Sequence, residues 1–89
     1  MLEEGEIKAK VDWVFTLEIE GDIYLDRGDV AGSASCASEA NAIQDELERH
    51  GVTLEEHEES AECWYVLVDD HRRWQFDTGN WLWSVVASS

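Results

Sequence analysis

Apolar and polar residues alternate along the first part of the chain. The apolar positions are Ile7, Ala9, Val11, Trp13, Phe15, Leu17 and Ile19, and most residues between them are polar. A period of two is typical of a half-buried strand in an antiparallel sheet, with one dry side and one wet side. The pattern therefore predicts a strand over residues 7–20, with Trp13 in the core.

Turn residues follow this predicted strand. Gly21 and Asp22 suit a tight turn, and residues 23–25 have the composition of a short returning strand. Arg27-Gly28-Asp29 and Gly32-Ser33 then predict a loop, because they are rich in residues that favour turns. The first third of the chain is thus expected to form a β-hairpin.

A helix is predicted next, because apolar residues recur at three- and four-residue spacing at Cys36, Ala40, Ile43 and Leu47. Ser35 or Ser38 is expected to cap its start, since a hydroxyl can accept a hydrogen bond from a free backbone N–H. Gly51 is expected to end it in the left-handed conformation that glycine adopts without steric penalty.

The second half of the chain predicts strands at residues 63–68, 73–77 and 81–86, after a short extended piece at 52–54. Turn residues separate them at 69–72 and 78–80. The strand Trp81–Val86 is apolar on both sides, so it is expected either to be central and covered or to meet another protomer in a homodimer.

These elements predict an α+β fold in the order β-β-α-(β)-β-β-β. The expected architecture is an antiparallel β-sheet of four to five strands with one α-helix packed on one face. A chain of 89 residues has room for one domain, so residues 1–89 are expected to form a single acidic α+β domain with a thin core.

The net charge is the most informative feature of the composition for the function of the chain. The chain has 21 Asp and Glu against six Lys and Arg, which gives a formal net charge of −15. Direct binding to nucleic acid or to an anionic membrane is disfavoured, because both need Lys and Arg to neutralise phosphates. Such a charge either attracts a basic partner or serves solubility in high salt, where screening weakens self-repulsion.

The expected partner-binding residues are carboxylates spread over the strand, the helix and the loops. Residues two apart on one strand face are about 6.6–6.8 Å apart, close to the rise of two nucleotides along one DNA strand, so Glu18 and Glu20 are candidates to imitate phosphates. Helix acids one turn apart have a similar potential. The full predicted set is Asp12, Glu18, Glu20, Asp45, Glu46, Glu48, Glu55, Glu56, Glu58, Glu59, Asp69 and Asp70.

No motif for catalysis, metal or cofactor stands out. His50, His57 and His71 lack zinc-site spacing and are interpreted as surface residues. Cys36 and Cys63 are interpreted as packed thiols, not nucleophiles or a disulfide. Each Trp is more simply explained by core packing than by binding, but a Trp exposed beside carboxylates is the leading candidate for a partner anchor.

The N-terminus lacks a basic segment followed by an apolar one, and no apolar run approaches about 18 residues. The sequence therefore predicts a cytoplasmic protein without a membrane anchor.

The favoured function is a non-catalytic inhibitor that occupies a basic, nucleic-acid-binding surface of a partner, such as an effector or nuclease. In size, acidity and lack of catalytic motifs, the chain is similar in character to small phage-encoded anti-defence proteins, including anti-CRISPR and anti-restriction inhibitors that act as DNA mimics. Two alternatives remain open. One is an immunity or antitoxin protein that neutralises a basic toxin; the other is a halophilic protein whose acidity serves solubility, which two Lys against four Arg also fits.

Overall fold

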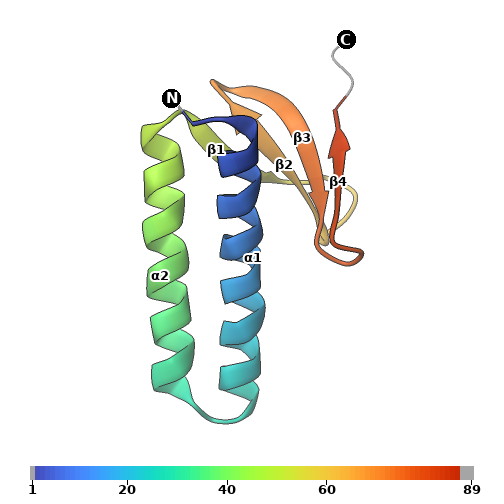
Figure 1. Ribbon diagram of the computed structural model, residues 1–89. Coiled ribbons are helices and arrows are strands. Elements are labelled where there is room, and N and C mark those ends of the chain that lie inside the picture. Colours follow the sequence, from blue (N-terminus) through green and yellow to red (C-terminus); the bar gives the residue numbers. More distant parts are fainter. Residues whose placement is uncertain (1, 87–89) are drawn as a thin grey trace. The chain divides into compact units, whose positions relative to one another are not determined.

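The computed structural model describes residues 2–86 and divides the chain into two compact units, one up to His50 and one from Gly51 onward. The first unit is a pair of helices and the second is a four-stranded antiparallel sheet (Figure 1). The fold class is α+β, but the predicted arrangement with one helix is wrong, because the order is α-α-β-β-β-β. The expectation of a single domain over 1–89 stays a prediction.

The first element is helix α1 (Glu4–Asp26), where the alternating pattern predicted a strand, a turn and a returning strand. The apolar residues also fit a helical spacing, and the buried positions follow that spacing: Ile7, Val11, Val14, Phe15, Leu17 and Gly21. The prediction of a strand is wrong because both periods coexist in this segment. Trp13 and Ile19, which belong only to the period of two, are 46% and 45% exposed.

Helix α2 (Val30–Arg49) confirms the predicted helix, and Cys36, Ala40 and Leu47 of its predicted apolar stripe are buried. Its start lies earlier than expected. The cap is Asp29, whose side chain accepts a hydrogen bond from the backbone N–H of Gly32 at 2.9 Å, so the prediction of Ser35 or Ser38 as the cap is wrong. Gly51 adopts the expected positive φ, +78°.

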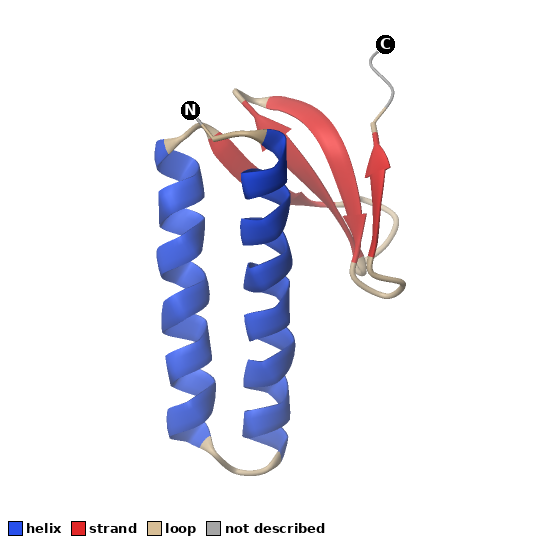
Figure 2. Cartoon of the chain, viewed as in Figure 1, coloured by secondary structure: helices blue, strands red, loops and turns tan. Residues whose placement is uncertain are grey.

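The two helices form an antiparallel hairpin (Figure 2). Gly21 lies at a close approach: a Cβ built on it would be 3.5 Å from the Cβ of Cys36 and 3.7 Å from the carbonyl oxygen of Ser33. Nearer the other end of α1, Lys10 Nζ pairs with Glu46 Oε2 of α2 at 3.3 Å. Close packing at Gly21 and the ion pair between Lys10 and Glu46 thus help to join two helices that carry many negative charges.

The sheet contains β1 (Val52–Glu56), β2 (Cys63–Val68), β3 (His71–Asp77) and β4 (Leu82–Val85) in sequence order, each antiparallel to the next. The predicted strand at 63–68 is confirmed to the residue. The strands predicted at 73–77 and 81–86 are confirmed with shifted ends, and the extended piece at 52–54 is the start of β1. A register shift lies between Val66 and Leu67.

One face of the sheet is buried. Val66 lies opposite Trp74, and both are buried together with Val52 and Phe76. Of the two alternatives for the last strand, a central position is wrong, because β4 stands at the end of the strand order with β3 as its neighbour. A meeting with another protomer stays a prediction. Leu82 and Val85 of β4 are 61% and 78% exposed.

No helix among residues 2–86 combines the length and the apolar character needed to cross a membrane.

Candidate functional site

The most regular charged feature of the hairpin is a row of carboxylates on α1. Glu18, Asp22 and Asp26 follow one another at four-residue spacing and are all exposed. In a helix this spacing places them on one side, about 6 Å apart along the axis. Within the described part of the chain, no Lys or Arg forms an ion pair with them. We call these three residues the acidic row.

A hollow of about 280 Å³ lies beside the acidic row. It is lined by Leu17, Glu18, Gly21, Asp22, Ser33 and Ala37. Desolvation at the wall of the hollow raises the pKa of the Glu18 carboxyl above its ordinary value, although the residue as a whole is exposed, and the neighbouring charge of Asp22 raises it further. Two carboxylates therefore repel each other in this hollow, and a cation placed there would relieve the repulsion.

This repulsion predicts that Glu18→Gln stabilises the protein at pH 7. Like charges at i and i+4 destabilise a helix by about 0.2–0.5 kcal/mol, and Gln removes the charge while keeping the shape. Because its pKa is raised on folding, Glu18 binds a proton more tightly in the folded state, so its penalty is present at neutral pH. The penalty fades as the pH falls through the folded pKa towards the ordinary value of 4.5.

Urea unfolding of Glu18→Gln at pH 7 and at pH 4 measures this effect, and Glu20→Gln is the matched control with the same change in charge. We expect the advantage of Glu18→Gln over Glu20→Gln at pH 7 to shrink at pH 4. Equal unfolding midpoints for the two variants at pH 7 would contradict the account.

Trp13 lies on another side of α1. Its indole Nε1 donates a hydrogen bond to Glu39 Oε1 of α2 at 3.4 Å, and its side chain is 46% exposed. The prediction that Trp13 is a core residue is wrong, because the helix turns it away from the stripe formed by Ile7, Val11 and Val14. An exposed Trp beside a carboxylate is the arrangement that marks a candidate anchor for a partner.

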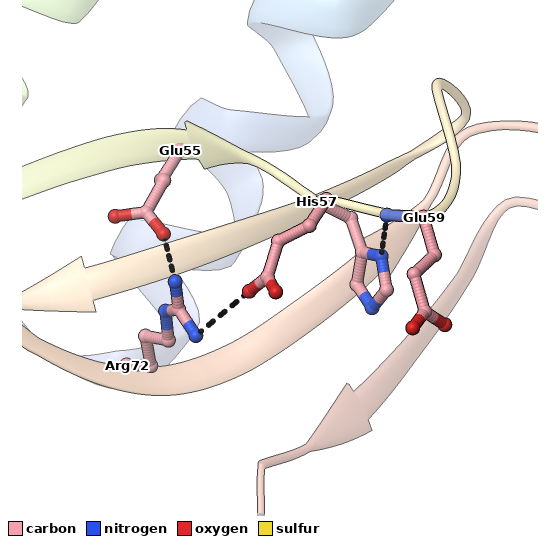
Figure 3. A network of polar contacts seen from close by, with 5 residues as sticks. Glu55, His57, Glu59 and Arg72 are labelled. Carbon is pink, nitrogen blue, oxygen red and sulfur yellow. Dashed lines mark hydrogen bonds and ion pairs between the residues drawn. The ribbon is translucent and has the colours of Figure 1, made fainter.

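The sheet unit carries a polar network around Arg72 (Figure 3). The guanidinium of Arg72 donates a hydrogen bond to Glu55 and forms an ion pair with Glu58 at 3.4 Å. It also lies 4.2 Å from the centroid of the Tyr65 ring. The hydrogen bond that Arg72 donates to Glu55 is the main cause that raises the pKa of Arg72. This network neutralises part of the acidic run that follows β1.

His57 belongs to the same network. Its ring stacks on Tyr65 at 5.0 Å between centroids, and its Nδ1 accepts a hydrogen bond from the backbone N–H of Glu59 at 3.0 Å. Figure 3 shows this hydrogen bond together with the ion pair between Arg72 and Glu55. The contacts explain His57 as a residue that orders the loop after β1.

The predicted partner-binding residues are thus dispersed. On α1, Glu18 and Glu20 are two residues apart and therefore project from nearly opposite sides of the helix. The spacing argument for successive phosphates on a strand is wrong. Asp12 is half-buried and accepts a hydrogen bond from the Thr16 hydroxyl at 3.4 Å.

The remaining predicted residues lie on four other segments. Asp45, Glu46 and Glu48 are on α2, where Glu46 is paired with Lys10. Glu55 and Glu56 are on β1, Glu58 and Glu59 follow it, and Asp69 and Asp70 form the β2–β3 turn with φ of 52° and 68°. The structure brings only Glu55 and Glu58 of this set together, at Arg72.

Sequence reasoning missed Asp22, Asp26 and Glu39. The first two share the four-residue spacing of Glu18, a signal that is legible only once residues 4–26 are read as a helix. Glu39 becomes a candidate through its contact with Trp13, which joins two helices and is not contained in the local sequence pattern.

In the part of the chain that the structure describes, no group of three or more His, Cys, Asp or Glu side chains is arranged to hold a metal ion. Cys36 is a buried free thiol, and Cys63 is a half-buried one. Burial raises the pKa of Cys36, with further contributions from Glu20, Glu39 and Asp29, and the thiol is therefore held in its less nucleophilic form.

Compared with known proteins, the chain matches no protein-family model, no curated protein and no solved structure.

Proposed function

We propose that this chain is a non-catalytic acidic binding protein that occupies a basic surface of a partner protein. The partner surface is of the kind that otherwise holds nucleic acid, as in a nuclease or another nucleic-acid-binding effector. The observation that carries the proposal is the acidic row, Glu18, Asp22 and Asp26, which is exposed and without an ion pair to Lys or Arg in the described residues.

The geometry of the row supports this choice over a merely acidic surface. Its carboxylates are about 6 Å apart along a rigid helix, while phosphates two nucleotides apart rise about 6.8 Å along a DNA strand. A groove built for phosphates would meet carboxylates with a comparable rise along the row, and its counterions would be released on binding as they are for nucleic acid. The acidic row therefore offers the partner a substitute for a short stretch of the DNA phosphate backbone.

The electrostatics of the hairpin support it further. Residues up to His50 contain 13 Asp and Glu against four Lys and Arg, a formal charge of −9 in the unit that carries the row. Charge of this density steers a basic partner and speeds association at low salt. Trp13, exposed and held by Glu39, supplies an aromatic contact on the same hairpin. The proposal includes a cytoplasmic encounter, because both cysteines are free thiols, which a reducing compartment maintains.

The test is competition for a basic DNA-binding protein that holds fluorescently labelled duplex DNA. The probes are a purified basic nuclease and a helix-turn-helix repressor, with a basic protein that binds no nucleic acid as the comparison. We expect the wild-type chain to displace DNA from at least one probe at 50 mM NaCl and to lose affinity steeply as salt rises. Affinity that ignores ionic strength would contradict the proposal.

The row is tested with a triple variant, Glu18→Gln, Asp22→Asn and Asp26→Asn. Each exposed ion pair is worth about 0.2–1 kcal/mol, so losing three is expected to weaken binding about 3- to 150-fold. The matched control is Asp45→Asn, Glu48→Gln and Glu56→Gln, which removes the same charge from other exposed positions. Equal losses for the two variants would show that total charge, and not the row, binds the partner.

A further inference from the structure

Among the described residues, strand β4 is a short edge strand of four residues that carries neither a charged side chain nor a proline. It stands at the end of the strand order, and β3 is its neighbour (Figure 1). Unprotected edges expose a row of backbone donors and acceptors that can pair with another strand. Proteins block such pairing with charged side chains, proline, bulges or coverage. The register of β3 with β4 has no bulge, and the chain has no proline.

Charge sets β4 apart from the rest of the molecule. No residue from 78 to 89 carries a charged side chain, in a chain with a net charge of −15. The opposite edge strand, β1, contains Glu55 and Glu56, so that edge has the usual protection. The same sheet therefore has one guarded edge and one that is uncharged.

The side chains of β4 continue the apolar face of the sheet. Val85 lies opposite Trp74, so the two side chains share a face, and Trp74 is 4% exposed while Val85 is 78% exposed. On the other face, Leu82 is 61% exposed. Leu82 lies opposite Asp77 on that face, so the apolar surface that continues onto β4 is the face of Trp74 and Val85.

The hydrogen-bond pattern shows which backbone groups turn outward. The N–H of Val86 donates to the carbonyl of Arg73 at 3.1 Å, so Val86 faces β3. Because inward and outward positions alternate along an antiparallel strand, the N–H and C=O of Val85 point to the outer edge. These are the groups that an added strand would use.

We infer that the outer edge of β4 pairs antiparallel with β4 of a second copy of this chain. The second copy supplies an edge with the same uncharged, apolar character, and an antiparallel pairing about a two-fold axis satisfies both edges with the same contacts. A basic partner would find no carboxylate on residues 78–86. The edge and the acidic row consequently serve different partners, and this inference is independent of the proposed function.

The net charge gives this dimer a distinctive salt dependence. Two copies together have a formal net charge of −30, twice the −15 of one chain, and their repulsion is screened as salt rises. Self-association is therefore expected to strengthen with salt, whereas binding of a basic partner weakens. The two interactions can be told apart by this sign alone.

The test is sedimentation equilibrium of the full chain from 20 to 500 mM NaCl. We expect a monomer–dimer equilibrium whose dissociation constant falls with salt. In Val85→Glu the dissociation constant is expected to rise about tenfold or more, because each copy then places a carboxylate on the edge that pairs. Thr53→Glu on β1 is the matched control, with the same net charge on the other edge, and it should dimerise as the wild type does.

Amide hydrogen exchange of the wild type provides a readout that needs no variant. The Val85 amide is expected to exchange more slowly as protein concentration rises, while the amides of β1 keep their rates. A chain that is monomeric at millimolar concentration at every salt would overturn the inference. So would a dimer that Thr53→Glu dissociates and Val85→Glu does not, or a Val85 amide whose exchange ignores concentration.

Discussion

Phe76→Ala is expected to reduce the free energy of unfolding by about 3–5 kcal/mol, the range for removing a buried Phe ring. Phe76 is fully buried in β3, and its ring lies 4.9 Å from that of Trp81 and 4.8 Å from that of Trp83. The substitution leaves a cavity and removes two ring contacts at once. Because small domains are stable by only about 5–15 kcal/mol, the sheet unit is expected to be partly unfolded at 37 °C.

Urea unfolding followed by Trp fluorescence measures this loss, since four of the five Trp lie in the sheet unit. Gln75→Ala is the matched control, because it shortens the adjacent, half-buried residue of the same strand on the other face. We expect the control to lose less than about 1 kcal/mol. Similar midpoints for the two variants would show that Phe76 does not anchor the sheet.

The strands of the sheet were predictable because each signal is local. Cys63–Val68 is a run of β-formers bounded by turn residues, and the turn at 78–80 separates two such runs. Gly51 was likewise predictable, because its position after an apolar stripe calls for a left-handed residue. Where β4 lies in the strand order depends on pairing between distant residues, which the local pattern does not contain.

Helix α1 was mispredicted for a physical reason. Its segment holds two apolar periods at once, and the outward-facing Trp13 and Ile19 complete the period of two. Length favours the helix, since strands are most often about 5–6 residues long and a 14-residue alternation is exceptional. The segment also contains Glu, Lys, Ala and Leu, which favour helices. A buried stripe at Ile7, Val11 and Val14 decides between the two periods.

This error propagated to the candidate site. A strand pairs Glu18 with Glu20, whereas a helix pairs Glu18 with Asp22, so one wrong period exchanges the partners of every carboxylate on α1. The pairing of Arg72 with Glu55 and Glu58 depends on how β1, β2 and β3 align. The acidity of the chain follows directly from its composition. Which charges remain without an ion pair depends on the helical period and on the strand register.

Leu47→Ala is expected to destabilise the helical hairpin by about 2–5 kcal/mol. Leu47 is 1% exposed near the end of α2, and its removal leaves a cavity that neighbouring backbone, fixed in a helix, cannot easily fill. Ile43→Ala, one turn earlier and half-buried, is the matched control and should lose less.

Two spectroscopic probes show which unit unfolds in Leu47→Ala, in addition to how much stability is lost. Far-UV circular dichroism follows α1 and α2, while Trp fluorescence mainly follows the sheet unit. Coincident transitions in the variant would mean that both units unfold as one, as the prediction of a single domain over 1–89 requires. If the helical signal is lost first, the hairpin is a separate unit, and binding through the acidic row should fail while β4 self-association persists. A midpoint for Leu47→Ala no lower than that of Ile43→Ala would contradict the role assigned to Leu47, because the hairpin would then not depend on its most buried α2 side chain.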